Sequence, residues 1–206
     1  MKRLFNDIGQ NKQEMLQKQI KIIRKEYLRG DKINTSFLVS HLIFIKRGSL
    51  RQNNYIYSMN DIIGLSSIFS SSPFYEGNIY AETLTSVDLI TKEDVLFLIN
   101  SDHKIMLNLL QLISDEFKKN QTHLLMLSHI EYDKRLLHYF YNEYKLNNAT
   151  TFLINYKKKE LAQYLLIDAK SFTVELNKLI KSNIISNQNK LYTILDIDLV
   201  EKIIQK

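Results

Sequence analysis

Residues 161–185 read Leu-Ala-Gln-Tyr-Leu-Leu-Ile-Asp-Ala-Lys-Ser-Phe-Thr-Val-Glu-Leu-Asn-Lys-Leu-Ile-Lys-Ser-Asn-Ile-Ile, and their apolar spacing predicts two short helices. The first helix covers about 157–165, and the second covers about 169–181. Asp168, just before the second helix, is a favourable N-cap residue. Two helices joined by a three-residue turn form a helix-turn-helix. The expected inward-facing residues are Leu161, Ala162, Leu165, Phe172, Leu176, Leu179 and Ile180.

The flanking segments extend this motif to a winged helix-turn-helix over 132–206. Upstream, residues 132–144 predict an amphipathic helix, which Asn147-Asn148 ends, and residues 151–154 predict a brief strand. Downstream, the runs 184–186 and 191–195 flank Asn187-Gln-Asn189, a pattern typical of a β-hairpin.

A long helix is predicted before this domain, over about 104–128, within a dimerisation segment 104–131. Its apolar residues alternate in steps of four and three, which is the seam of a coiled coil with Asn120 as its polar position. Leu109, Leu112 and Leu125 widen the apolar face, so the helix can serve both a partner and its own domain. The alternative is an amphipathic helix packed only on its own β-domain. The seam residues are Met106, Leu110, Ile113, Phe117, Asn120, Leu124 and Leu127.

Residues 1–103 predict an antiparallel β-roll, which makes the whole chain an α+β protein. Short β-branched and aromatic runs alternate with turn residues such as Gly30-Asp31, Gly48, Asn60-Asp61 and Gly64. A short helix leading into a strand is expected over 16–23. Helix signals are weak elsewhere in this half. The expected strands lie at 36–40, 41–45, 55–57, 78–80 and 86–90.

The composition is that of an ordinary globular protein with a basic C-terminal region. Lys and Arg number 28 against 22 Asp and Glu, a net charge of +6, and the 206 residues include no cysteine. Structural disulfides, iron–sulfur clusters and thiolate zinc sites are therefore excluded. No apolar run is long enough to span a membrane, so we expect a soluble, cytoplasmic protein. Within 157–190 the balance is seven lysines against three acidic residues.

The second helix of a helix-turn-helix lies in the major groove of DNA, led by its N-terminal residues. Its outward positions here are Ala169, Lys170, Thr173, Val174 and Asn177. Lysine and asparagine can reach guanine and adenine edges, and threonine can bond a base or touch a thymine methyl. Ser171 at the positive helix end can bond a phosphate. The lysines expected to neutralise the DNA backbone are Lys157, Lys158, Lys159, Lys178 and Lys190. The alternative is a small helical domain whose lysines only face solvent.

The 161–185 stretch resembles the helix-turn-helix of the Crp/Fnr transcription regulators. The N-terminal half resembles that family's cyclic-nucleotide-type β-roll, and the heptad helix falls where the family keeps its dimer helix. The resemblance implies a bacterial, homodimeric DNA-binding regulator and leaves RNA polymerase open as a further partner. The segments that carry it, in order, are 30–31, 42–48, 60–64, 81–85 and 87–90.

Two departures from the family pattern affect the expected mechanism. Leu65 stands where cyclic-nucleotide binders place a glutamate for the ribose, and Phe74-Tyr75-Glu76 offers no cation where they place an arginine for the phosphate. We therefore expect no cyclic AMP binding, because an anionic nucleotide needs charged donors there. In the recognition helix, Ala169 and Val174 stand where many members have the two arginines that read guanine, and Asp168 and Lys170 stand where they have a serine and a glutamate. Either the operator is AT-rich and read partly through DNA shape, or DNA binding is weak or lost.

Other chemistry finds little support in the sequence. None of the five histidines pairs with another at helical metal-site spacing, and no nucleotide loop or nucleophile elbow occurs. We expect no enzyme, no metal and no cofactor. If the β-roll binds an effector, the residues that line it indicate an apolar or aromatic one. The favoured interpretation is that these residues only fill the core. These residues are Phe37, Leu42, Phe44, Ile62, Phe69, Phe74, Tyr75 and Tyr80.

The sequence thus predicts a homodimeric regulator on a palindromic operator, with double-stranded DNA and a second copy of the chain as partners. One rival keeps the fold but makes it a protein-interaction module that has lost specific DNA binding. The other is a regulator gated by an unidentified small molecule.

Overall fold

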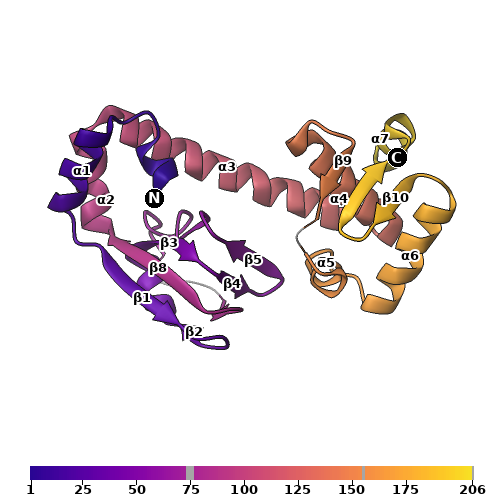
Figure 1. Ribbon diagram of the computed structural model, residues 1–206, viewed down its shortest axis with the longest axis horizontal. Helices are drawn as coiled ribbons and strands as arrows, with labels where there is room; N and C mark the ends of the chain where they lie inside the picture. Colours follow the sequence, from indigo (N-terminus) through magenta and orange to yellow (C-terminus); the bar gives the residue numbers. More distant parts are fainter. Residues whose placement is uncertain (73–76, 155, 206) are drawn as a thin grey trace. The chain divides into compact units, whose positions relative to one another are not determined.

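The computed structural model describes residues 1–72, 77–154 and 156–205. The chain divides into two compact units, Met1–Lys119 and Asn120–Lys206. The long helix α3 (His103–Ser128) contributes residues to both units. Figure 1 labels this helix and colours it by residue number. The predicted long helix is therefore present, and the boundary between the units falls inside it.

Two four-stranded antiparallel sheets build the N-terminal unit, in the orders β1-β8-β3-β6 and β2-β7-β4-β5. The predicted antiparallel roll is confirmed, although β2, β4 and β6 were not predicted. Strands β2 and β6 are two residues long, and β4 (Ser-Leu-Arg-Gln) contains a single apolar residue, so none of them shows the pattern that predicts a strand. The strands are β1 (Ile23–Tyr27), β2 (Lys32–Ile33), β3 (His41–Arg47), β4 (Ser49–Gln52), β5 (Tyr55–Ser58), β6 (Ile62–Ile63), β7 (Ile79–Ala81) and β8 (Thr85–Thr91).

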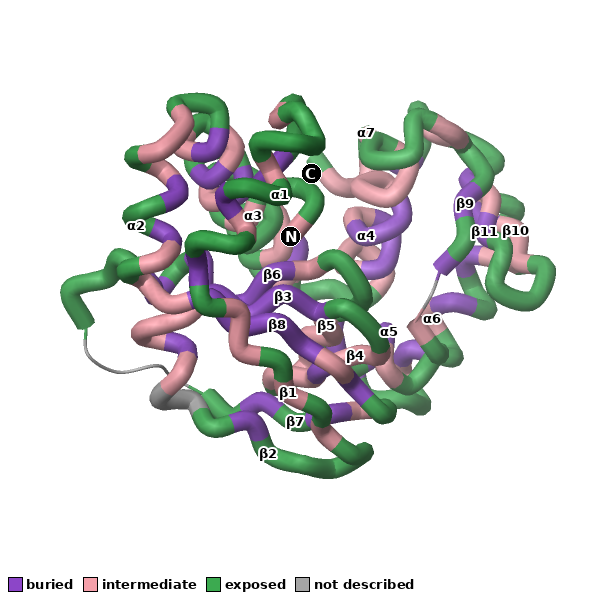
Figure 2. Tube along the Cα trace, turned by 60° about the vertical axis from the view of Figure 1, so that its left-hand side comes forward, coloured by how far each residue is buried: buried purple, intermediate pink, exposed green. Residues whose placement is uncertain are grey.

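The residues of β3 and β8 alternate between two separate cores, and Figure 2 shows both strands as buried. Ile43 and Val87 join Leu50 and Ile79 of the other sheet in the core inside the roll. Phe44 belongs to a second core, beneath the helices. This division follows from the two-residue period of a strand.

The expected lining of the roll is therefore wrong for Leu42, Phe44 and Ile62, which lie on the helical side of the first sheet. Phe37 does pack against the inner core. Phe69 and Tyr80 are each 40% exposed, and Phe74 and Tyr75 lie outside the described residues. The inner core is instead made of smaller aliphatic side chains that are almost fully buried: Ile33, Leu38, Ile43, Ile45, Leu50, Ile63, Ile79, Ala81, Val87 and Leu89.

Helices cover the outer face of the first sheet. They are the 3-10 helix η1 (Lys2–Phe5), α1 (Gln10–Gln19), α2 (Lys92–Ser101) and the first part of α3, all of which contribute to the second core. Helix α2 was not predicted, although Thr91 caps it by accepting a hydrogen bond from the Asp94 backbone at 3.1 Å. Residues 36–40 were predicted as a strand, which is wrong, because a 3-10 helix η2 (Thr35–Val39) occupies this stretch.

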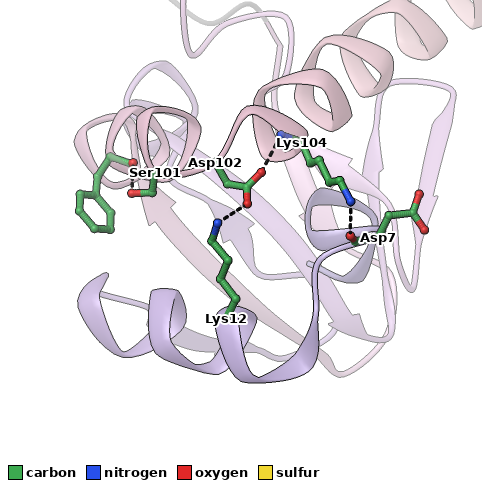
Figure 3. A network of polar contacts seen from close by, with 6 residues as sticks. Asp7, Lys12, Ser101, Asp102 and Lys104 are labelled. Carbon is green, nitrogen blue, oxygen red and sulfur yellow. Dashed lines mark hydrogen bonds and ion pairs between the residues drawn. The ribbon is translucent and has the colours of Figure 1, made fainter.

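Asp102 organises the junction of α2 and α3, as Figure 3 shows. One carboxylate oxygen accepts from the backbone N–H of Lys104 at 2.7 Å, and the other meets Lys12 Nζ of α1 at 2.5 Å. The hydrogen bond from Lys12 lowers the pKa of Asp102. The Lys104 side chain also reaches the Asp7 carbonyl oxygen at 3.3 Å. These contacts hold α1 against the start of α3.

Two glycines permit sharp turns in the roll. Gly48, between β3 and β4, has φ +82°, and an added Cβ would lie 2.4 Å from the Leu84 carbonyl oxygen. Gly64, just after β6, has φ +99°, and its Cβ would lie 2.7 Å from the His41 carbonyl oxygen. Any side chain at either position would be both strained and too close to backbone.

The C-terminal unit has the predicted winged helix architecture. Its sheet has the order β10-β11-β9, and Phe140 of α4 stacks on Tyr192 of β11 with ring centroids 5.3 Å apart. Asn148 ends α4 in the left-handed conformation, with φ +48°. Helix α7 was not predicted. The elements are α4 (Tyr132–Asn147), β9 (Thr151–Leu153), α5 (Lys158–Tyr164), α6 (Ala169–Lys181), β10 (Ile185–Gln188), β11 (Leu191–Ile194) and α7 (Ile197–Ile204).

Candidate nucleic-acid interface

The turn between α5 and α6 fixes the start of the candidate recognition helix. Asp168 Oδ1 accepts from the backbone N–H groups of Ser171 at 2.9 Å and Lys170 at 3.1 Å. The predicted N-cap is therefore present, and its hydrogen bonds, with those of Ser171 the strongest, lower the pKa of Asp168. Leu166 in the turn has φ +53°, a conformation that few residues other than glycine or asparagine adopt.

Helix α6 separates cleanly into a buried and an open face. Phe172, Leu176 and Leu179 pack in the core of the unit. Ser171 is half-buried at the helix start. The remaining residues predicted to face DNA are exposed along the other side: Ala169, Lys170, Thr173, Val174, Asn177 and Lys178.

Local contacts already engage some of these side chains. Thr173 Oγ1 donates to the Ala169 carbonyl oxygen at 2.8 Å, which leaves the hydroxyl oxygen able to accept. Lys178 Nζ lies 2.8 Å from Glu175 Oε1, so this lysine is partly neutralised. Val174 is 45% exposed and places an apolar group in the middle of the face. The face can therefore combine polar and methyl contacts.

The predicted phosphate-neutralising lysines are exposed at three places in the unit. Lys157, Lys158 and Lys159 stand at the start of α5, where the Lys157 backbone N–H donates to Glu160 Oε2 at 2.8 Å. Lys190 is exposed in the turn of the β10–β11 hairpin, which the Asn187 side chain braces by donating to the Asn189 carbonyl oxygen at 2.9 Å. The surplus of positive charge thus extends over α5, α6 and the wing.

Arg135 of α4 contributes to this site, and its role was not predicted from the sequence. Its guanidinium donates to the carbonyl oxygens of Leu165 at 3.2 Å and Leu166 at 3.1 Å, so it holds the turn of the helix-turn-helix. No local pattern signals this role, because about 30 residues of chain separate the donor from its acceptors. An arginine in the first turn of an amphipathic helix is ordinarily solvent-facing.

The predicted dimer seam lies along one side of α3. Phe117 is 62% exposed and Leu124 is 67% exposed, and Leu110 and Asn120 are exposed as well. Met106, Ile113 and Leu127 are half-buried. By contrast, Leu109 and Leu112 are buried in the core of the N-terminal unit. In the predicted wider face, only Leu125 is exposed, at 61%.

Leu65, expected from the resemblance to stand at the ribose-binding position, is a buried apolar side chain. Leu65 belongs to the core beneath the helices, directly after Gly64. Ser67 instead satisfies local backbone, donating to the Leu38 carbonyl oxygen at 2.5 Å. The expected arginine position, within 73–76, lies outside the described residues. Among the residues that the structure describes, no group of three or more potential metal ligands occurs, and no helix is long and apolar enough to cross a membrane.

A β-roll, a long helix and a winged helix-turn-helix together define the fold of the Crp/Fnr-type transcription regulators, and solved structures of such proteins match this chain. A variant of CooA from Carboxydothermus hydrogenoformans is 14% identical, with a TM-score of 0.75 over 98% of this chain and 94% of that chain. FixK2 from Bradyrhizobium japonicum is 12% identical, with a TM-score of 0.64 over 89% and 97%.

A Crp/Fnr-family transcriptional regulator from Eubacterium rectale is 17% identical, with a TM-score of 0.55 over 98% of both chains. No protein-family model matches the sequence, and no curated protein matches it. At these identities the likeness establishes the fold: the chain has a Crp/Fnr-like fold.

Proposed function

We propose that the protein is a DNA-binding transcription regulator of the Crp/Fnr type. The observation that carries this proposal is the open face of α6, held by a capped turn and surrounded by exposed lysines. The transcriptional regulator from Eubacterium rectale with the same fold supports it. A helix of this kind inserts into the major groove and reads base edges with its outward side chains.

The outward side chains favour an AT-rich operator. Asn177 can pair with adenine, Thr173 can bond a base, and Ala169 and Val174 offer methyl groups to thymine. Lys170 is a cation of this face that can read a base, and it lacks the bidentate fork with which arginine reads guanine. Sequence preference is then expected to come partly from the shape of the DNA.

The operator is expected to be palindromic because the protein is proposed to act as a homodimer. The exposed seam on α3 supplies an apolar surface that the described part of the chain leaves uncovered at Phe117 and Leu124. A second copy, packed in parallel against this seam, would cover it and would pair the two Asn120 side chains. Two recognition helices related by a two-fold axis bind half-sites about one helical turn, ~34 Å, apart.

Cyclic AMP is not expected to control the protein. Leu65 and Phe74-Tyr75-Glu76 provide neither the ribose acceptor nor the phosphate cation, and Glu76 would repel a phosphate. Among the described residues, ten buried apolar side chains and four partly buried ones pack together inside the roll, which supports a packed core there. An apolar effector in the roll and a protein-interaction role are the rival proposals.

The first experiment is a fluorescence-anisotropy titration on the DNA upstream of the protein's own gene, with scrambled DNA of equal composition as the control. Tight, selective binding that weakens with salt supports a regulator that needs no effector. Weak binding that is equal on both DNAs contradicts this and favours one of the two rivals.

Replacing Lys170 and Thr173 with alanine tests the recognition face directly. Loss of the Lys170 and Thr173 base contacts is expected to weaken operator binding by about 10-fold, which is less than two bidentate contacts of ~1–3 kcal/mol each would give. Binding to scrambled DNA should change far less. Lys202→Ala, which removes an exposed lysine of α7, is the matched control. Unchanged operator affinity in the double variant would refute the assignment of α6.

A further inference from the structure

Two histidines meet directly where the chain passes from α3 to α4. His129 Nε2 and His138 Nδ1 are 3.0 Å apart, and the ring centroids are 5.3 Å apart. The two rings therefore face each other through their nitrogen-bearing edges. Both residues belong to the C-terminal unit, and both are half-buried.

This contact depends on protonation. A hydrogen bond between two imidazoles needs one nitrogen that donates and one that accepts. The pair can therefore hold no added proton or one, but with two added protons both nitrogens are donors and both rings carry positive charge. At 3.0 Å, two imidazolium rings repel each other.

The neighbouring charges oppose the second proton. Burial lowers the pKa of His138, and the charge of His129 lowers it further. The pKa of Glu131 is lowered mainly by a hydrogen bond from its own backbone and by Lys134, and only slightly by His129. Lys134 Nζ lies 3.6 Å from Glu131 Oε1, so this carboxylate is already paired. Arg135 of α4 is a further cation at the pair, through the backbone of His129. The second proton is therefore harder to add to the pair than the first.

One residue connects the histidine pair to the helix-turn-helix. Arg135 Nε donates to the His129 carbonyl oxygen at 2.7 Å, while its Nη1 donates to the carbonyl oxygens of Leu165 and Leu166. Leu166 is held in a left-handed conformation two residues before Asp168, the cap of α6. A displacement of His129 therefore changes the anchor of the turn that orients α6.

We propose that the hydrogen bond between His129 and His138 is a proton-sensitive contact, here called the latch, and that Arg135 is the positioning residue through which it controls the orientation of α6. With the latch closed, the turn is held for sequence-specific DNA binding. With both rings protonated, the latch opens and specific binding weakens. This inference rests on the proposed function.

The test compares the protein with His138→Asn, because the asparagine amide takes the place of Nδ1 and does not titrate. The ratio of operator to scrambled-DNA affinity is measured by anisotropy between pH 7.5 and 5.5. For the unaltered protein, the ratio is expected to fall about fivefold or more towards pH 5.5, a typical coupling between two sites. In His138→Asn it should stay constant. An equal fall in both proteins would overturn the proposal.

A second readout needs no DNA. The Nε–H resonance of Arg135 in a nitrogen-15 NMR spectrum is expected to change its chemical shift between pH 7.5 and 5.5, because its hydrogen bond to the His129 carbonyl oxygen is lost, and to keep its position in His138→Asn. A resonance that is unchanged by pH in the unaltered protein would overturn the latch by itself. His129→Gln serves as the second variant if His138→Asn does not fold. No selective binding at any pH would instead overturn the proposed function, and with it the link to DNA.

Discussion

At Glu116 of α3, a carboxylate oxygen is buried without a hydrogen-bond partner within the described part of the chain. Burial, with a smaller contribution from the nearby charge of Asp61, raises the pKa of Glu116 to about 7. In the unfolded chain the group titrates near 4.5. The folded protein thus binds this proton more tightly than the unfolded chain, so the contribution of Glu116 to stability is fully present below about pH 4.5 and is lost as the pH rises through about 7.

Glu116→Gln should therefore stabilise the protein at pH 8, because it keeps the size of the side chain and removes the ionisation. We expect about 1–2 kcal/mol after allowance for partial solvent screening, and almost no effect at pH 4.5. Urea unfolding at both pH values measures the difference. Asp115→Asn, which alters the exposed neighbour that pairs with Arg3, is the control. Equal effects of Glu116→Gln at both pH values would contradict the claim that ionisation of buried Glu116 destabilises the protein.

Helix α3 shows how one element serves two surfaces. Leu109 and Leu112 pack into the N-terminal unit, whereas Phe117 and Leu124 on another face are largely exposed. Burying two such apolar side chains contributes about 1.5–3 kcal/mol each, which favours covering them. The apolar width predicted from the sequence is thus divided between the protein's own core and a face that is open to a partner.

Replacing Phe117 and Leu124 with aspartate should produce monomers, since four charges would then face one another across the proposed parallel seam. Sedimentation equilibrium is expected to give the mass of one chain for the variant and of two chains for the unaltered protein. Gln111→Asp places the same charge on an exposed position of α3 outside the seam and should leave the dimer intact. If the double variant sediments as a dimer, α3 is not the interface.

For the molecule as a whole, the distribution of charge matters more than the net value of +6. The lysines around α5, α6 and the wing lie in one compact unit, which suits the phosphate backbone of DNA. Such contacts release counterions and add affinity without sequence preference. Substituting these lysines should therefore weaken binding to all DNA equally, whereas substituting the open face of α6 should weaken binding to the operator in particular.

Lys158→Gln with Lys159→Gln should weaken binding to operator and scrambled DNA by the same factor. The slope of log affinity against log salt should fall by about 2 in magnitude, close to 1 for each lost phosphate contact. Anisotropy titrations at several salt concentrations give both quantities. A loss confined to the operator would mean that these lysines read bases, and an unchanged slope would remove them from the interface.

Local sequence determined the elements whose signals lie within one or two turns of helix. The heptad spacing of α3, the cap at Asp168 and the apolar stripe of α6 all depend on near neighbours, so their positions could be predicted closely. The winged helix-turn-helix and its candidate DNA-facing residues followed from these signals.

Only the tertiary structure decided features that depend on residues far apart in the chain. Whether Leu42 or Ile43 faces the inside of the roll depends on which side of the sheet the helices cover, and alternation alone leaves that choice open. The contact of Arg135 with Leu166 and the meeting of His129 with His138 likewise arise from packing. A sequence pattern predicts which residues lie on the same face of a helix or strand. Which other part of the chain packs against that face depends on the tertiary structure.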